Sequence, residues 1–101
     1  MKISTLQGEV REFSKNKGFE NATIEERALF LVTEIGEVVQ EVLKISSKHD
    51  SDDINKLKEQ LGFEIYDVIW NLFDLANKLD IDLEDAFRKK SEINKYRHWD
   101  E

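Results

Sequence analysis

The chain has no cysteine and no proline, and only four of its 101 residues are glycine. Without cysteine there is no disulfide bond, no thiolate zinc site and no cysteine nucleophile. Without proline, and with so little glycine, nothing in the sequence breaks a long helix in its interior. The glycines are isolated, so the sequence contains neither a phosphate-binding P-loop nor a dinucleotide fingerprint.

Basic stripes and long apolar runs are missing as well. The formal net charge is −7, and the clearest local excess of charge is acidic, so we expect no nucleic-acid polymer as a partner. No apolar run reaches membrane-spanning length, and residues 1–10 contain no uninterrupted apolar stretch. We therefore expect a cytoplasmic protein without a membrane partner, built as one domain over residues 1–101.

Apolar residues recur at helical spacing in four stretches. We expect helices over residues 3 to about 16, 23 to about 45, 52 or 53 to about 79, and 82 to about 96. Thr23 precedes Glu26 by three residues, which is the pattern of a capping box, and Asp82 with Asp85 has the same spacing before the last helix. The connecting loops are short. The predicted fold class is therefore all-α, an antiparallel helical bundle of about four helices, which we expect dimerisation to complete.

Acidic residues cluster on two of the predicted helices, beside the apolar stripe rather than opposite it. At roughly 100° per residue, Glu34, Glu37 and Glu41 fall within an arc of about 60°. A similar arc on the third helix holds Gln60, Glu64, Asp67 and Asn71. Packing of the two helices would bring these groups together.

Carboxylates that converge need a counter-ion. Two like charges about 4 Å apart repel by ~1 kcal/mol in water and ~4 kcal/mol at an effective dielectric constant near 20. Ligand sets made only of oxygen favour Mg²⁺ or Mn²⁺ over Zn²⁺. The alternative interpretation is that these acids simply solvate the rim of the bundle.

Two segments at these positions resemble a known signature. Residues 33–37 read Thr-Glu-Ile-Gly-Glu and residues 64–67 read Glu-Ile-Tyr-Asp, similar to the EExxE…ExxD signature of MazG-like nucleoside triphosphate pyrophosphohydrolases. Residues 77–87 resemble the helix–loop–helix of that family, and its closing K-x-x-x-N-x-x-R-x-W pattern is matched by Lys90, Asn94, Arg97 and Trp99. Thr33 departs from the pattern, because the family usually has its first Glu there.

The resemblance implies a hydrolase that converts a nucleoside triphosphate and water to the monophosphate and pyrophosphate, with a role in house-cleaning of the nucleotide pool. It implies that the catalytic metal, Mg²⁺ or Mn²⁺, is held by Glu34, Glu37, Glu64 and Asp67. It further implies a homodimer or a dimer of dimers, in keeping with apolar residues on several faces of the predicted helices. The expected substrate-binding residues are Lys90, Asn94 and Arg97, which share one helix face, and Asn71.

Other interpretations stay open at this point. The chain could be a phosphoribosyl-ATP pyrophosphohydrolase, or a non-catalytic helical adaptor or regulatory dimer that has kept the fold, which Thr33 favours. Lys90 and Arg97 could merely compensate the negative end of the helix dipole at a helix C-terminus. Asn71 could be a residue at the rim of the bundle without a role in binding. We expect Trp70, Phe73 and Trp99 to be core or dimer-interface residues rather than platforms for a base.

Overall fold

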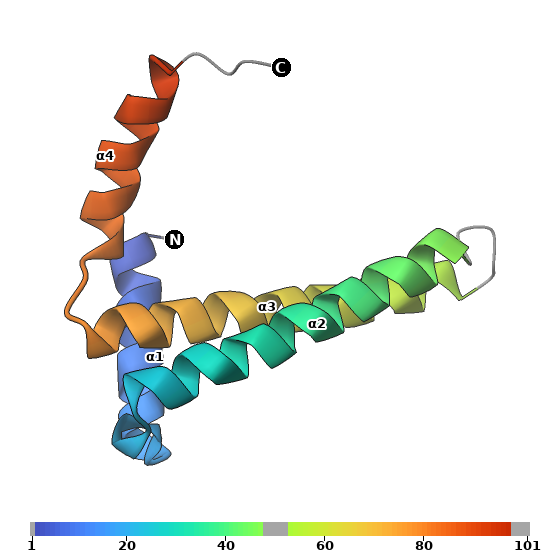
Figure 1. Cartoon of the computed structure of the whole chain (residues 1–101), viewed down its shortest axis with the longest axis horizontal. Helices are drawn as coiled ribbons and strands as arrows, with labels where there is room; N and C mark the ends of the chain where they lie inside the picture. Colours follow the sequence, from blue (N-terminus) through green and yellow to red (C-terminus); the bar gives the residue numbers. More distant parts are fainter. Residues whose placement is uncertain (1, 48–52, 98–101) are drawn as a thin grey trace.

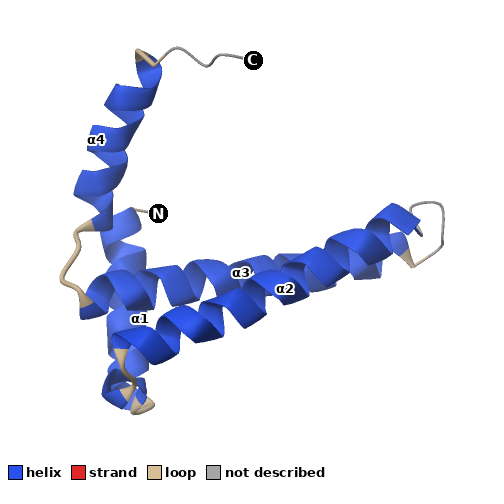
Figure 2. Ribbon diagram, viewed as in Figure 1, coloured by secondary structure: helices blue, strands red, loops and turns tan. Residues whose placement is uncertain are grey.

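The computed structural model describes residues 2–47 and 53–97, and these ranges contain helices and no strand (Figures 1 and 2). The elements are α1 (Ile3–Asn16), the 3₁₀ turn η1 (Phe19–Asn21), α2 (Ile24–Ser47), α3 (Ile54–Lys78) and α4 (Leu83–Lys95). The all-α prediction is confirmed. Asp52, the earlier of the two predicted starts of the third helix, and Trp99 lie outside the described residues.

The predicted caps are present. The Thr23 N–H donates to Glu26 Oε1 at 2.8 Å, and the Glu26 N–H donates back to Thr23 Oγ1 at 3.0 Å, which is a complete capping box at the start of α2. At the start of α4 the Asp85 N–H donates to Asp82 Oδ1 at 3.1 Å. Gly18 has φ of 77°, a left-handed conformation that glycine adopts at little cost, and it turns the chain from α1 into η1.

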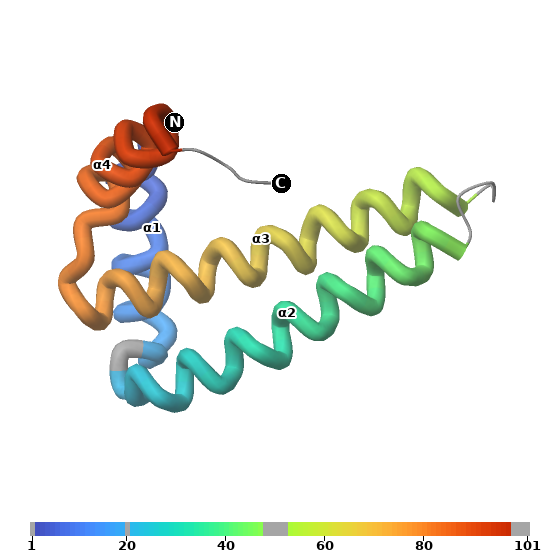
Figure 3. The backbone as a smooth tube through the Cα atoms, turned by 45° about the horizontal axis from the view of Figure 1, so that its top comes forward, coloured from blue at the N-terminus to red at the C-terminus, as the bar shows by residue number. Residues whose placement is uncertain are grey.

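Helices α2 and α3 pack as antiparallel neighbours and form a long hairpin (Figures 1 and 3). Helix α1 instead crosses α3, and α4 leaves the end of α3 to pack against α1, pointing away from the hairpin. A single chain therefore does not form the predicted four-helix bundle by itself, and completion of the bundle by a second chain stays a prediction. Left-handed residues at both corners, Gly18 and Asp80 with φ of 54°, redirect the chain at these two connections.

The crossing of α1 over α3 covers part of the apolar surface of α3. The Phe13 and Trp70 rings meet edge to face with their centroids 5.8 Å apart, and Val10 and Phe73 are buried. The sequence predicted that Trp70 and Phe73 are core or dimer-interface residues. Phe73 is buried within the single chain and is a core residue.

Gln7 connects α1 to the start of α4. Its buried amide donates to the Ile81 carbonyl at 2.6 Å and accepts from the Leu83 N–H at 3.1 Å. Beside it, the Ser4 N–H donates to Glu84 Oε1 at 3.1 Å. Helix α4 itself has no buried residue, and these polar contacts connect its N-terminal end to α1.

The apolar core is small and a large apolar surface is left uncovered. Among the described residues, the buried apolar ones are Val10, Phe73 and Ala76, whereas Leu29 and Val32 of α2 are 72 % and 68 % exposed. Exposed apolar area of this extent is typical of a surface that another subunit covers. None of the described helices is long and apolar enough to cross a membrane.

Candidate functional site

The hairpin brings the predicted acidic residues together from both of its helices. Carboxylate oxygens of Glu34 and Glu37 on α2 and of Glu64 on α3 all lie within 4.8 Å of one another. Asp67, one turn along α3 from Glu64, is not part of this group of three, but it lies close enough for its charge to raise the pKa of both Glu34 and Glu64. Glu41, in the same arc of α2, instead pairs with Lys44 at 3.2 Å.

The electrostatics of this acidic cluster favour the protonated forms of two of its members. Burial, followed by the charges of Glu37 and Asp67, raises the pKa of Glu34, and the nearby Arg27 only partly opposes this. The hydrogen bond shared with Glu37, followed by burial and the neighbouring charges, raises the pKa of Glu64. Without a cation, the cluster therefore takes up protons more readily than isolated glutamates do.

Two oxygen atoms of the cluster have no hydrogen-bond donor. Glu34 Oε2 and Glu64 Oε2 are buried, and among the described residues neither has a hydrogen-bond partner. Leaving a buried acceptor unsatisfied costs about 1–3 kcal/mol, and more when the group is charged. A hard divalent cation such as Mg²⁺ would satisfy both atoms, because it binds carboxylate oxygens. The residues present thus fit a metal of this kind.

A pocket of about 340 Å³ adjoins the cluster. Its acidic end is formed by Glu34 and Asp67, and its volume lies in the range of about 300–1,000 Å³ that is usual for small-molecule sites. Most of the remaining wall is aromatic and comes from α1, η1, α2 and α3: Phe13, Phe19, Phe30, Tyr66 and Trp70. Trp70, which the sequence predicted for the core or an interface, packs edge to face against Phe13 and Phe19 and also lines this pocket.

Two polar residues complete the pocket, Asn71 and Arg27. Asn71 is buried; its Nδ2 donates to the Asp67 carbonyl at 2.8 Å, and its Oδ1 accepts a hydrogen bond from Arg27 Nη2. Arg27 Nε lies 3.2 Å from Asp74 Oδ2. Sequence reasoning named Asn71 but missed Arg27, because an arginine beside two glutamates in a first helical turn normally indicates a solvated position.

The remaining candidates lie apart from the acidic cluster of their own chain. Lys90 and Asn94 belong to α4, and Arg97 follows its end; this helix projects away from the hairpin (Figures 1 and 3). Lys90 and Arg97 are exposed. Asn94 has a buried Oδ1 that accepts no hydrogen bond from any described residue.

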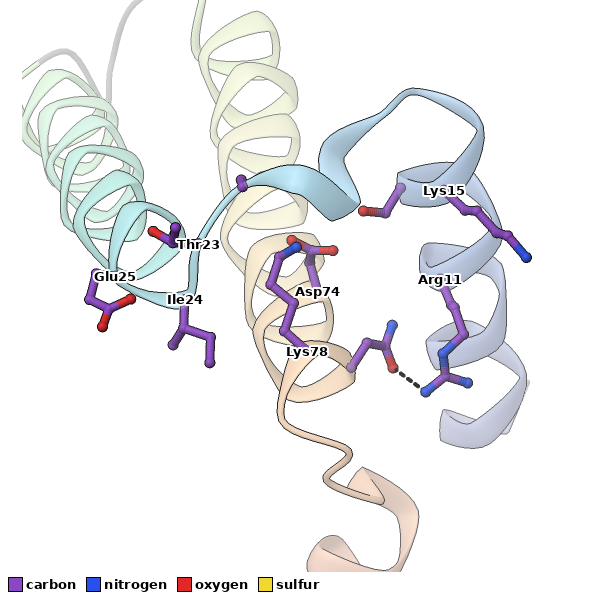
Figure 4. Close-up of a pocket in the computed structure, with 10 residues that line it drawn as sticks. Arg11, Lys15, Thr23, Ile24, Glu25, Asp74 and Lys78 are labelled. Carbon is purple, nitrogen blue, oxygen red and sulfur yellow. Dashed lines mark hydrogen bonds between the residues drawn. The ribbon is translucent and has the colours of Figure 1, made fainter.

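A larger pocket, of about 680 Å³, lies between α1, the start of α2 and the end of α3 (Figure 4). Its basic lining residues are Arg11, Lys15 and Lys78. Two of these cations are engaged in structural bonds: Lys78 Nζ donates to the Phe19 carbonyl at 3.1 Å, and Arg11 Nη2 to Asn77 Oδ1 at 3.0 Å. None of the four predicted metal ligands lines this pocket, so the smaller pocket is the candidate site.

Comparison with curated proteins and with solved structures finds no match. A family comparison does find one, and it spans the acidic cluster together with α4. The pattern of the MazG nucleotide pyrophosphohydrolase domain matches residues 22–100, which is most of the chain, and the protein therefore belongs to this family.

Proposed function

We propose that the protein is a Mg²⁺-dependent nucleoside triphosphate pyrophosphohydrolase, which cleaves a ribo- or deoxyribonucleoside triphosphate to the monophosphate and pyrophosphate and so helps to clean the nucleotide pool. The observation that carries this proposal is the pairing of buried, unsatisfied carboxylate oxygens of Glu34 and Glu64 with an adjoining aromatic pocket. Membership of the MazG family supports the same reaction class.

In this proposal the acidic cluster holds the metal, with Glu34, Glu37, Glu64 and Asp67 as ligands. A bound divalent cation neutralises phosphate charge and lowers the pKa of a coordinated water. The aromatic wall of the pocket receives the base, which places the α-phosphate toward Glu34 and Asp67 at the acidic end. Arg27 fixes Asn71, whose Nδ2 bonds to the carbonyl of Asp67.

We further propose that α4 serves the site of a second copy of the chain in a homodimer or a dimer of dimers. A triphosphate carries several negative charges, so a site built from carboxylates benefits from additional cations at the phosphates. Lys90, Asn94 and Arg97 would supply these contacts. The direction of α4 away from its own hairpin and the exposed Leu29 and Val32 on α2 support this arrangement.

The test is pyrophosphate release from a panel of canonical and damaged ribo- and deoxyribonucleoside triphosphates. We expect release with Mg²⁺, no release with chelator, and a loss of turnover in Glu37→Gln. The matched control is Glu59→Gln, an exposed glutamate of α3 outside the cluster, which should turn over at the wild-type rate. If no nucleotide in the panel is hydrolysed, the protein is a non-catalytic member of its family.

A further inference from the structure

The polar groups that could recognise a base in the aromatic pocket are few. Glu34 and Asp67 lie at its acidic end, and Asn71 already uses both ends of its amide within the protein. Tyr66 is 62 % exposed and stands at the edge. Arg27 is thus a largely buried side chain of the pocket wall that still has hydrogen-bond donors available for a ligand.

The guanidinium of Arg27 is held rigidly. Asp74 lies against its Nε, and Asn71 accepts from its Nη2. Its carbon Cζ lies 5.0 Å from the ring centre of Phe30, 5.9 Å from that of Phe19 and 6.0 Å from that of Trp70, within the range of cation–π attraction. No described residue accepts a hydrogen bond from Nη1, and 15 % of the side chain stays exposed.

A guanidinium donates hydrogen bonds and accepts none. Toward a base it therefore discriminates between a carbonyl, which accepts, and an exocyclic amino group, which donates. Uracil and thymine carry O4 where cytosine carries an amino group, and guanine carries O6 where adenine carries one. Loss of a carbonyl leaves the donor facing another donor in a partly dehydrated pocket, and both groups then lack a partner.

We infer that Arg27 makes the pocket selective for nucleotides whose base carries a carbonyl at C4 of a pyrimidine or at C6 of a purine: uracil, thymine, guanine or hypoxanthine rather than cytosine or adenine. This inference rests on the proposed function for the reaction, but not for the binding of the base. The inference also indicates which reaction would supply such substrates. Hydrolytic deamination converts the amino group of cytosine or adenine into a carbonyl.

Matched substrate pairs test the selectivity. dUTP and dCTP differ in the exocyclic group at C4 and in the hydrogen on the adjacent N3, and dITP and dATP differ in the same way at C6 and N1. We expect kcat/KM to favour dUTP and dITP by about ten- to a hundredfold, the ratio that corresponds to one hydrogen bond to a charged group. Arg27→Lys keeps a donor-only cation and should keep the direction of the preference. Equal kcat/KM within both pairs would overturn the inference.

Replacement of Arg27 alone leaves Asp74 buried without its partner, so the decisive variant is Arg27→Gln combined with Asp74→Asn. A glutamine amide both donates and accepts, so the preference within each pair should disappear. Arg11→Gln, which removes an arginine of α1 that does not line this pocket, should retain it. An unchanged preference in the double variant would show that Arg27 does not read the base.

A binding measurement separates this inference from the proposed reaction. dUMP and dCMP are titrated into the metal-free protein and followed by tryptophan fluorescence, to which Trp70 at the pocket contributes. We expect tighter binding of dUMP, and no difference in the double variant. A dUMP preference without hydrolysis of any triphosphate would refute the proposed reaction and sustain the inference. Equal binding of the two monophosphates would refute the inference.

Discussion

Arg27 and Asp74 form a buried ion pair between the first turn of α2 and the last third of α3, with 3.2 Å between Nε and Oδ2. Only 15 % of the Arg27 side chain and 2 % of the Asp74 side chain are exposed. Removing two charges from water costs several kcal/mol each, so such a pair persists only where other contacts satisfy it. Here Asn71 and the rings of Phe30 and Trp70 contact the guanidinium of Arg27. Asp74 Oδ2 has no hydrogen-bond partner among the described residues, so it depends on the charge of Arg27.

Breaking this pair should be far more destabilising than breaking an exposed one. Arg27→Met leaves the Asp74 carboxylate buried and unpaired, which we expect to lower the free energy of unfolding by about 3–5 kcal/mol. Combining it with Asp74→Asn should recover part of that loss. Urea unfolding without metal measures both. Lys44→Ala breaks the more exposed pair with Glu41 and should cost less than about 1 kcal/mol; an equally small effect of Arg27→Met would contradict the prediction.

The metal proposal predicts a thermal shift. Mg²⁺ at a hundred times its dissociation constant should stabilise the folded protein by about 2.7 kcal/mol, which raises the Tm of a domain of this size by roughly ten degrees or more. Glu37→Gln removes a like charge from the acidic cluster, so without Mg²⁺ it should melt at the wild-type temperature or above it. It should also lose most of the Mg²⁺ response. Glu59→Gln should keep the full thermal shift with Mg²⁺. If Glu59→Gln also lost this shift, the ion would be binding non-specifically to surface carboxylates.

The raised pKa values of Glu34 and Glu64 predict an unusual pH dependence for the metal-free protein. Between the ordinary value of 4.5 and the raised values, the folded state binds more protons than the unfolded state. Stability should therefore increase as the pH falls from neutral toward about 5. The lowered pKa values of Glu26, Glu84 and Asp85 act in the opposite direction, but only below the ordinary values of these groups, where stability is lost.

Urea unfolding at intervals between neutral pH and about pH 4 measures this dependence. The gain in stability on acidification should shrink in Glu34→Gln, because the variant cannot ionise at this position. It should also disappear at saturating Mg²⁺, since the ion then competes with the protons. A wild-type protein that only loses stability on acidification would show that the cluster is more open to water than the structure indicates.

The features that sequence reasoning found are those encoded locally. A capping box needs two residues three apart, and Thr23 with Glu26 forms it whatever the tertiary context. A spacing of three residues places both members of a pair on the same face of a helix. This holds for Glu34 and Glu37 on α2 and for Glu64 and Asp67 on α3. The packing of α2 against α3 then makes these faces meet, so the acidic cluster could be predicted before its geometry was known.

The features that sequence reasoning missed depend on how segments far apart in the sequence pack against one another. Arg27 and Asp74 are far apart in sequence, and nothing near either residue indicates a buried charge. Phe13 and Phe19 reach the pocket only because Gly18 turns the chain and α1 crosses α3. The direction of α4 depends on non-local contacts such as those of Gln7, which helical periodicity does not encode.

The final prediction concerns which subunit supplies α4 to the site. Arg97→Ala should lower kcat/KM by about ten- to a hundredfold, because a charge-assisted bond to phosphate is lost. Its Mg²⁺ affinity should stay unchanged, because the acidic cluster is intact. Arg88→Ala, at an exposed arginine of α4 paired with Asp85, is the matched control and should keep the wild-type kinetics.

Mixing two impaired variants then decides between an α4 that acts within its own chain and one that acts on its neighbour. Glu37→Gln protein has a defective acidic cluster and a normal α4, and Arg97→Ala protein has the reverse. If α4 serves the neighbouring subunit, each mixed dimer contains one site built entirely from native halves. Random mixing should then restore about a quarter of the wild-type activity, since half of the dimers are mixed and each has one intact site of two. If α4 serves its own chain, no mixed dimer contains an intact site, and activity should stay at the average of the two variants.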